Sequence, residues 1–256
     1  MATAIKNVLY GALDAVTLYR GVPRTIGNER VLFPAKWSRY YEADYEPETF
    51  RFFRKNLKPG DTVLDIGAHI GLFSVVTSRL VGETGKVYAF EPTPFTRGVL
   101  GEVVKLNGCD DNVEIRPEAV SDKKGTAHFF DTGTEVSNAN SLVETGRSKE
   151  KIEVPMISVD QFASEMGLTV NCLKIDVEGA ELDLLKGARK VLTEQRPLAR
   201  LGLHPEFMAA NGHSLEMIWD LLKYYRYRPD FNGSAISKQE FCSQPTLFDV
   251  NLFPEQ

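Results

Sequence analysis

The segment that decides the fold is Thr62–Gly71, with the sequence TVLDIGAHIG. Its apolar half, Thr62–Ile66, has the length and composition of a buried strand. Gly67 and Gly71 then mark a turn, and the apolar spacing of Leu72–Val81 predicts a helix after it. Strands and helices continue to alternate downstream. This alternation predicts a doubly wound α/β domain, with helices on both faces of a mainly parallel sheet.

The same reasoning places the other elements. Predicted strands are Ile26–Phe33, Lys86–Phe90, Asn112–Val120, Thr126–Phe130, Ile152–Ile157, Asn171–Val177, Leu198–Leu203 and Thr246–Leu252. Predicted helices are Glu48–Leu57, Phe95–Leu106, Ala180–Leu192 and Ser214–Tyr224, the last with Ser214 as its cap. Pro117, inside one of the strands, indicates an edge position or a bend. We divide the chain into an N-terminal extension, residues 1–60, and a single α/β domain, residues 61–256.

The composition is that of an ordinary globular protein of 256 residues, 43% hydrophobic and 25% charged. A formal net charge of −5 argues against a dedicated nucleic-acid binder. The three cysteines lack the spacing of a metal site or a disulfide framework, so we expect reduced thiols and a cytoplasmic location. Stable membrane insertion is not expected, because no apolar run reaches the length of a membrane span.

An amphipathic helix is expected near the N-terminus, where apolar residues from Ile5 to Tyr19 fall at helical spacing. We expect this helix to pack on its own domain or on a second copy of the chain, as the interface of a homo-oligomer. Docking on a membrane surface is the alternative, but Lys6 and Arg20 give the polar face little charge for that role.

The first strand ends in the pattern D-x-G-x-x-x-G, formed by Asp65, Gly67 and Gly71. In a sheet of this kind ligands bind beyond the carboxyl ends of the strands. A dinucleotide site needs G-x-G-x-x-G, so that the pyrophosphate reaches a helix N-terminus, and a carboxylate at Asp65 would repel that group. The same carboxylate suits the ammonium group of S-adenosylmethionine. The pattern therefore favours S-adenosylmethionine as the cofactor.

Glu91, followed by Pro92, ends the second strand. It comes after the glycine turn at about the interval, roughly 20 residues, at which an acidic residue accepts hydrogen bonds from ribose hydroxyls. At the end of the third predicted strand, three residues are placed to flank an adenine ring: Ala119, Val120 and Ser121. This last pattern is also that of an ordinary strand end followed by a turn.

Charged residues follow the fourth and fifth predicted strands. Asp176 and Glu178 stand next to Lys174, and such groups are costly to bury without a partner or a ligand. His204 follows the fifth strand and can accept a proton near neutral pH. His69, inside the glycine turn, is a further candidate contact of the ligand or the acceptor, although a histidine hydrogen-bonded to the backbone fits the sequence equally well.

Together these motifs resemble the FkbM family of S-adenosylmethionine-dependent methyltransferases. The likeness is carried by TVLDIGAHIGLFS, VYAFEP, VEIRPEAVSDKKG, ISVDQF and LKIDVEGAELDLLKGA, at residues 62–74, 87–92, 113–125, 157–162 and 173–188. It implies the class I methyltransferase fold, a Rossmann-like, mainly parallel sheet of seven strands with an antiparallel last strand. It also implies methylation of hydroxyl groups on sugars, glycolipids or polyketides.

The resemblance implies roles for individual residues. It assigns the methionine end to Asp65, Gly67 and Gly71, the ribose to Glu91, and the adenine side to Ala119, Val120 and Ser121. Tyr45 and Glu46 resemble a segment that closes over the cofactor. Many members carry a glutamate two residues before the histidine of the fifth strand, but here Gly202 stands at that place. A carboxylate that would orient the histidine or bind a metal is therefore missing.

The expected reaction is in-line transfer of the sulfonium methyl to an acceptor hydroxyl, with the two groups held about 3–3.5 Å apart. We assign His204 as the base, and Asp176 as the residue that orients the acceptor or takes the proton itself. No metal is predicted; a divalent cation, if one is used, would lie at Asp176 and Glu178. The acceptor is expected to be a hydroxylated small molecule or carbohydrate. The aromatic segment Trp37–Tyr45 and the polar loop Asp131–Lys151 are expected to select it.

Two other classes of protein stay open at this point. A nicotinamide-dependent oxidoreductase is built on a similar sheet, but the glycine spacing disfavours it. A catalytically silent cofactor-binding module could act through the N-terminal helix. Methylation of nucleic-acid bases is disfavoured, because DVEG follows the fourth strand where that chemistry commonly uses a (D/N)PP(Y/F) loop.

Overall fold

The computed structural model of the protein describes residue 10, residues 20–131, residue 142 and residues 150–255. Two predictions fall largely outside these ranges: the N-terminal amphipathic helix and most of the polar loop Asp131–Lys151. None of the helices in the described ranges combines the length and the hydropathy of a membrane span.

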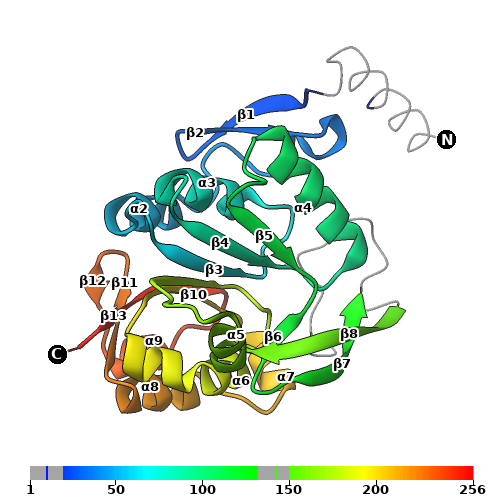
Figure 1. Ribbon diagram of the computed structural model, residues 1–256. Helices are drawn as coiled ribbons and strands as arrows, with labels where there is room; N and C mark the ends of the chain where they lie inside the picture. The colour runs from blue at the N-terminus through cyan, green and yellow to red at the C-terminus, as the bar shows by residue number, and fades with distance from the viewer. Residues whose placement is uncertain (1–9, 11–19, 132–141, 143–149, 256) are drawn as a thin grey trace.

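A central sheet of eight strands carries the fold, in the spatial order β12-β11-β13-β10-β9-β3-β4-β5 (Figure 1). Its strands are β3 (Thr62–Ile66), β4 (Lys86–Phe90), β5 (Val113–Arg116), β9 (Cys172–Ile175), β10 (Leu198–Leu203), β11 (Tyr227–Phe231), β12 (Ser234–Ala235) and β13 (Phe248–Pro254). The strands β3, β4, β5, β9 and β10 pair in parallel, whereas β13 is antiparallel to both neighbours. The strand order reverses between β3 and β9, which is where sheets of this type bind ligands.

Helices cover both faces of this sheet, as predicted (Figure 1). One face carries α2 (Pro47–Asn56), α3 (Leu72–Val81) and α4 (Pro94–Leu106), and the other carries α5 (Val159–Met166), α6 (Glu181–Gly187), α8 (Leu215–Tyr224) and α9 (Lys238–Cys242). Each face has its own apolar core. On the first face Phe50 and Phe53 of α2 pack against Phe73 of α3. On the second, Phe162 of α5 packs against Phe90 of β4.

A second sheet of three strands, in the order β6-β8-β7, lies beside the first. It consists of β6 (Ala119–Ser121), β7 (Gly125–Asp131) and β8 (Glu150–Ser158). The predicted strand Asn112–Val120 is therefore divided at Pro117. Its first part is β5 of the central sheet, and its second part, β6, pairs with β8 instead. The proline supplies the bend, because it has no N–H to continue the ladder.

The predicted strand Ile26–Phe33 is wrong in its boundaries. The structure has a hairpin there, β1 (Val22–Ile26) paired with β2 (Glu29–Phe33) in antiparallel register. Its two-residue turn is Gly27 and Asn28, which have φ of 53° and 71°. Positive φ at both central residues is the requirement of a type I′ turn, for which glycine and asparagine are suited.

Four further differences concern the C-terminal half. The predicted helix Ala180–Leu192 is shorter in the structure, where α6 (Glu181–Gly187) is followed by a π-helical turn, Val191–Gln195. The strand β11 was not predicted, because Pro229 and alternating charges disguise it. The sheet has one strand more than the seven expected, because the two-residue β12 pairs with β11. A short helix, α7 (Pro205–Ala210), directly follows β10.

Candidate active site

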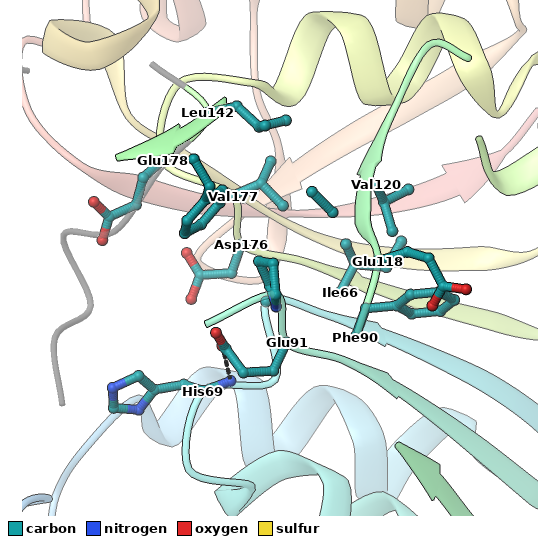
Figure 2. A pocket seen from close by; sticks show the side chains of 14 residues that line it. Ile66, His69, Phe90, Glu91, Glu118, Val120, Leu142, Asp176, Val177 and Glu178 are labelled. Atoms are coloured by element: carbon teal, nitrogen blue, oxygen red, sulfur yellow. Dashed lines mark hydrogen bonds between the residues drawn. The ribbon is translucent and has the colours of Figure 1, made fainter. Parts of the chain in front are cut away.

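Two adjoining cavities open at the carboxyl ends of β3, β4 and β9. The first cavity lies between the ends of these strands and the start of the second sheet (Figure 2). The second cavity lies between the aromatic segment before α2, the end of β10 and the start of β13. Four residues line both cavities: Gly67, His69, Asp176 and Glu178. The two cavities therefore share a wall.

The glycine turn after β3 lies against the chain after β9. Gly67 has a φ of 80°, and a Cβ atom at this position would lie 1.9 Å from the carbonyl oxygen of Asp176. The amide of Gly67 donates to the carbonyl of Phe90, at 3.1 Å. Gly71 has a φ of 89°, and a Cβ there would lie 2.5 Å from Cδ1 of Leu100. Glycine is required at Gly67, where the added atom would overlap backbone, and it is favoured at Gly71 by the positive φ.

Glu91 forms part of the floor of the first cavity (Figure 2). Its carboxylate accepts hydrogen bonds from the amides of His69, at 3.1 Å, and Thr93, at 2.9 Å. Only 7% of the residue is exposed. Burial raises the pKa of Glu91 to about 7, although the bonds from Thr93 and His69 partly oppose the shift. The carboxylate keeps acceptor capacity for a ligand with hydroxyl groups.

The walls of the first cavity are mainly apolar. Ile66 and Phe90 come from the central sheet, and Val120 and Phe129 from the second sheet. Figure 2 shows Ile66, Phe90 and Val120 on one side, opposite the carboxylates of Asp176 and Glu178. Another polar lining residue, Glu118, is bound by Arg116, with Nη2 of the arginine 2.6 Å from Oε1. Such walls fit a flat ring with polar edges.

A buried ion network lies beneath the shared wall. Lys174, 5% exposed, places Nζ 3.3 Å from Oδ2 of Asp176 and 3.9 Å from Oδ1 of Asp65. Burial opposes the charge of Lys174, but attraction to both carboxylates outweighs it and raises its pKa. Asp65 is fully buried, accepts a hydrogen bond from Ser74 Oγ at 2.6 Å, and lines neither cavity. Its side chain faces the network below, and its contact with the methionine end stays a prediction.

His204 stands between two carboxylates. Its Nδ1 lies 2.7 Å from Oε1 of Glu181, and its Nε2 lies 3.5 Å from Oδ1 of Asp176. Burial disfavours the imidazolium, but the hydrogen bond to Glu181 and the charge of Asp176 outweigh it and raise the pKa of His204 to about 9. Burial likewise opposes ionisation of Asp176, but Lys174 and His204 keep its pKa below the ordinary value. At neutral pH the resting pair is an imidazolium next to a carboxylate.

A carboxylate from another element lies at His204, although Gly202 carries none. Glu181, in the first turn of α6, is fully buried and lies against Nδ1 of His204. Sequence reasoning missed it, although a glutamate directly after the motif DVEGA was the available signal. At Gly202 itself, a Cβ would lie 3.0 Å from Oδ1 of Asp249 and 3.3 Å from Oδ1 of Asp176, so glycine leaves room for these two acids.

His69 belongs to the shared wall and faces the aromatic segment. Its Nδ1 lies 3.0 Å from the hydroxyl of Tyr41, and Tyr40 packs on the ring with centroids 4.9 Å apart. Burial lowers the pKa of His69 to about 4, so the ring is neutral at physiological pH. Glu46 lines the second cavity rather than the first, and it accepts a hydrogen bond from Thr49 Oγ1.

The structure brings together most of the predicted site residues. The first cavity receives Gly67, His69, Glu91, Pro92, Ala119, Val120 and Asp176, and the second receives Glu46 and His204. The predicted residues Asp65, Gly71 and Ser121 line neither of these cavities. Among the described residues, no group of three or more His, Cys, Asp or Glu side chains could hold a metal ion.

This sheet, with β13 antiparallel between β10 and β11 and a cavity at the β3–β9 reversal, is that of the class I methyltransferases. A solved structure described as an rRNA-methylase from Clostridium thermocellum shares the fold, with a TM-score of 0.50 and 13% identity. The alignment covers 82% of this chain and 94% of that one. The chain belongs to the family of the methyltransferase FkbM domain, whose model matches residues 65–229.

Curated relatives agree with this family. The methyltransferase sdnD of Sordaria araneosa is 30% identical over 161 residues, which are 52% of this chain and 62% of that protein. The 31-O-demethyl-FK506 methyltransferase FkbM of Streptomyces tacrolimicus is 28% identical over 162 residues, 51% of this chain and 60% of that protein. The matched region thus spans about three fifths of the length of either relative.

Proposed function

We propose that this protein transfers the methyl group of S-adenosylmethionine to a hydroxyl oxygen of a small molecule or carbohydrate. The observation that carries the proposal is the wall shared by the two cavities. A methyl donor in the first cavity and an acceptor in the second would meet at Asp176, His69 and Glu178. In-line transfer needs the reacting atoms at about 3–3.5 Å, and adjoining cavities supply that proximity.

The residues of the first cavity fit the cofactor. The carboxylate of Glu91 accepts hydrogen bonds from the ribose hydroxyls, and the apolar walls with Ala119 and Val120 enclose the adenine. The turn at Gly67 leaves room where a Cβ would clash with the neighbouring chain. We assign contact with the cofactor's ammonium to Asp176 and Glu178 in place of Asp65. When bound, the cofactor supplies an electrophilic methyl group on a sulfonium.

The acceptor proton goes to His204 or Asp176. Nε2 of His204, in the second cavity, lies 3.5 Å from a carboxylate oxygen of Asp176 in the shared wall. A pKa of about 9 means that His204 becomes a competent base as the pH rises. A positive charge arriving in the first cavity disfavours the imidazolium and moves that pKa toward neutrality. Asp176 is ionised throughout the physiological range and is the second candidate.

An oxygen acceptor has independent support in one relative, whose name, 31-O-demethyl-FK506 methyltransferase, denotes transfer to an oxygen. The family also disfavours the two other classes that the sequence left open, a nicotinamide-dependent oxidoreductase and a silent module. Absence of a nucleic-acid partner and self-association through the N-terminal helix stay predictions. Deletion of residues 1–20 followed by light scattering tests the second.

Calorimetric titration with S-adenosylhomocysteine, with NAD as the comparison, tests the cofactor. We expect micromolar binding of the first ligand, strongly weakened in Glu91→Ala and little changed in Asp183→Asn, a substitution on α6 outside both cavities. Binding of NAD alone would refute the proposal. Transfer of labelled methyl to a panel of sugars and hydroxylated natural products tests the reaction. His204→Ala and Asp176→Asn should each lower turnover by roughly 10²–10⁴-fold if that residue is the base. Turnover that survives a chelator would exclude a divalent cation at Asp176 and Glu178.

A further inference from the structure

Glu181 is a fully buried carboxylate that lines neither cavity. Its Oε1 lies 2.7 Å from Nδ1 of His204 and accepts a hydrogen bond from the amide of Gly179 at 3.1 Å. Its Oε2 is buried without a hydrogen-bond partner in the described structure. An ionised carboxylate is costly to bury unless it is paired, so the imidazole is the partner that makes this placement tolerable.

The ring of His204 is fixed on three sides. Glu181 binds one nitrogen, Phe207 stacks on the ring at 9° with centroids 6.0 Å apart, and the other nitrogen faces Asp176. Only 9% of His204 is exposed. The hydrogen bond at one imidazole nitrogen determines which tautomer the ring adopts when neutral. A carboxylate at Nδ1 requires the hydrogen there, which leaves the lone pair on Nε2.

We propose that Glu181 is the positioning residue of His204: it accepts the Nδ1 hydrogen and so presents Nε2 to the shared wall as the nitrogen that exchanges a proton. The inference rests on the proposed function for the identity of the proton, which comes from the acceptor hydroxyl. The state of the ring itself is measurable without methyl transfer. Glu181 acts through His204 and does not touch the reacting groups.

No other described carboxylate is as well placed for this role. Asp249, the register partner of Gly202, is held by Arg200, with Nη2 3.0 Å from Oδ2. Asp176 faces the opposite nitrogen and is paired with Lys174. Glu181 therefore supplies, from a helix, the orienting carboxylate that β10 does not carry.

The charged groups around the ring determine the direction in which the pKa of His204 should change when Glu181 is replaced. The charged groups that face His204 or its carboxylate partners come from α6, from β9 and the chain after it, and from β13: Glu181, Lys174, Asp176, Glu178 and Asp249. Removing the charge of Glu181 takes away the carboxylate hydrogen-bonded to the imidazolium and leaves the charges of Asp176 and Glu178. The pKa of His204 should then fall from about 9 by roughly 1–3 units.

Nuclear magnetic resonance of the full chain with labelled histidine tests this, since only four histidines are present. The resonance of His204 is assigned with His204→Gln and followed from pH 5 to 10 in the wild type, in Glu181→Gln and in Asp183→Asn. The glutamine keeps the shape and removes the charge, and the asparagine removes a half-exposed carboxylate from the same helix. We expect the midpoint to fall only in Glu181→Gln. An unchanged midpoint in that variant overturns the proposal.

A second measurement needs no variant, so it serves even if Glu181→Gln does not fold. Above its midpoint, neutral His204 in the wild type should carry its hydrogen on Nδ1, which the nitrogen chemical shifts report. A hydrogen on Nε2 overturns the proposal. Failure of the proposed function would be seen in different measurements: the wild type would neither bind S-adenosylhomocysteine nor transfer methyl, whatever the pKa and tautomer of His204.

Discussion

Ionisation of Glu91 should be coupled to occupancy of the first cavity. In the free protein burial raises the pKa of this carboxyl to about 7 from an ordinary 4.5. Ribose hydroxyls donate hydrogen bonds, and a carboxylate accepts them better than the protonated acid does. A bound nucleoside therefore stabilises the ionised form, lowers the pKa of Glu91 and releases a proton. The affinity for S-adenosylhomocysteine must then rise with pH through the free-state pKa.

The size of the effect follows from the two pKa values. With a free-state pKa of about 7, roughly a tenth of the Glu91 carboxyls are ionised at pH 6 and roughly nine tenths at pH 8. If binding returns the pKa to the ordinary 4.5, the dissociation constant falls about tenfold between these pH values, or about 1.4 kcal/mol. Nearly one proton per ligand is released at pH 6, and little is released at pH 8.

Calorimetry in buffers of different ionisation enthalpy measures both the affinity and the protons released. Glu91→Gln should abolish the pH dependence, and loss of the charged acceptor should cost about 1.5–3 kcal/mol of binding at pH 8. Asp249→Asn is the matched control. Its pKa is raised to about 6, chiefly by burial, so it titrates nearby but lines only the second cavity. A wild-type affinity that is flat from pH 6 to 8 would refute the reasoning, as would a pH dependence that persists in Glu91→Gln.

Three further outcomes are expected. Gly67→Ala should abolish ligand binding and lower the melting temperature, because its Cβ overlaps a carbonyl oxygen. Gly82→Ala, also at positive φ but with nothing within 4 Å of the added Cβ, should lower stability without affecting binding. Equal loss of binding in both variants would contradict this. Lys174→Met should lower the free energy of unfolding by about 3–5 kcal/mol in urea titrations, because it leaves buried carboxylates without their cation. The control Lys186→Met, at a half-exposed position, should lower it by less than about 0.5 kcal/mol. With S-adenosylhomocysteine bound, glucosamine should bind in the second cavity more tightly than glucuronate in a calorimetric titration, because carboxylates outnumber basic side chains there. Tighter binding of glucuronate would contradict a negative electrostatic potential in this cavity.

Much of the fold was predictable because its central strands are buried on both faces. Runs such as Thr62–Ile66 and Leu198–Leu203 are mainly apolar, with one charged residue each, which is close to the pattern of parallel strands covered by helices. The hairpin of β1 and β2 was missed because its two-residue turn lies inside an otherwise strand-like stretch. β11 was missed because it lies near the edge of the sheet, where polar residues and proline are tolerated.

The candidate site, like the fold, was predictable only in part. Gly67, Glu91, Asp176 and His204 could be found from the sequence, because each directly follows a recognisable strand and parallel strands bring their carboxyl ends together. The position of Glu181 could not. Its contact with His204 joins a helix to the end of a strand 23 residues away, and it depends on how α6 packs on the sheet. The sequence did not show that Asp65 would line neither cavity, because that depends on the pairing of β3 with β9, which sets Asp65 beside Lys174.

The first cavity lies at a seam between two sheets. Ile66, Phe90 and Glu91 belong to the central sheet, while Val120 and Phe129 belong to the smaller one. The bend at Pro117 separates the two sheets, so the two sides of the cavity are held by different hydrogen-bonded ladders. Substitutions in the smaller sheet can reshape the space around a bound base without moving the strands that carry Asp176 and His204. Preference for a cofactor or an inhibitor can therefore drift in such a protein while its reaction chemistry is preserved.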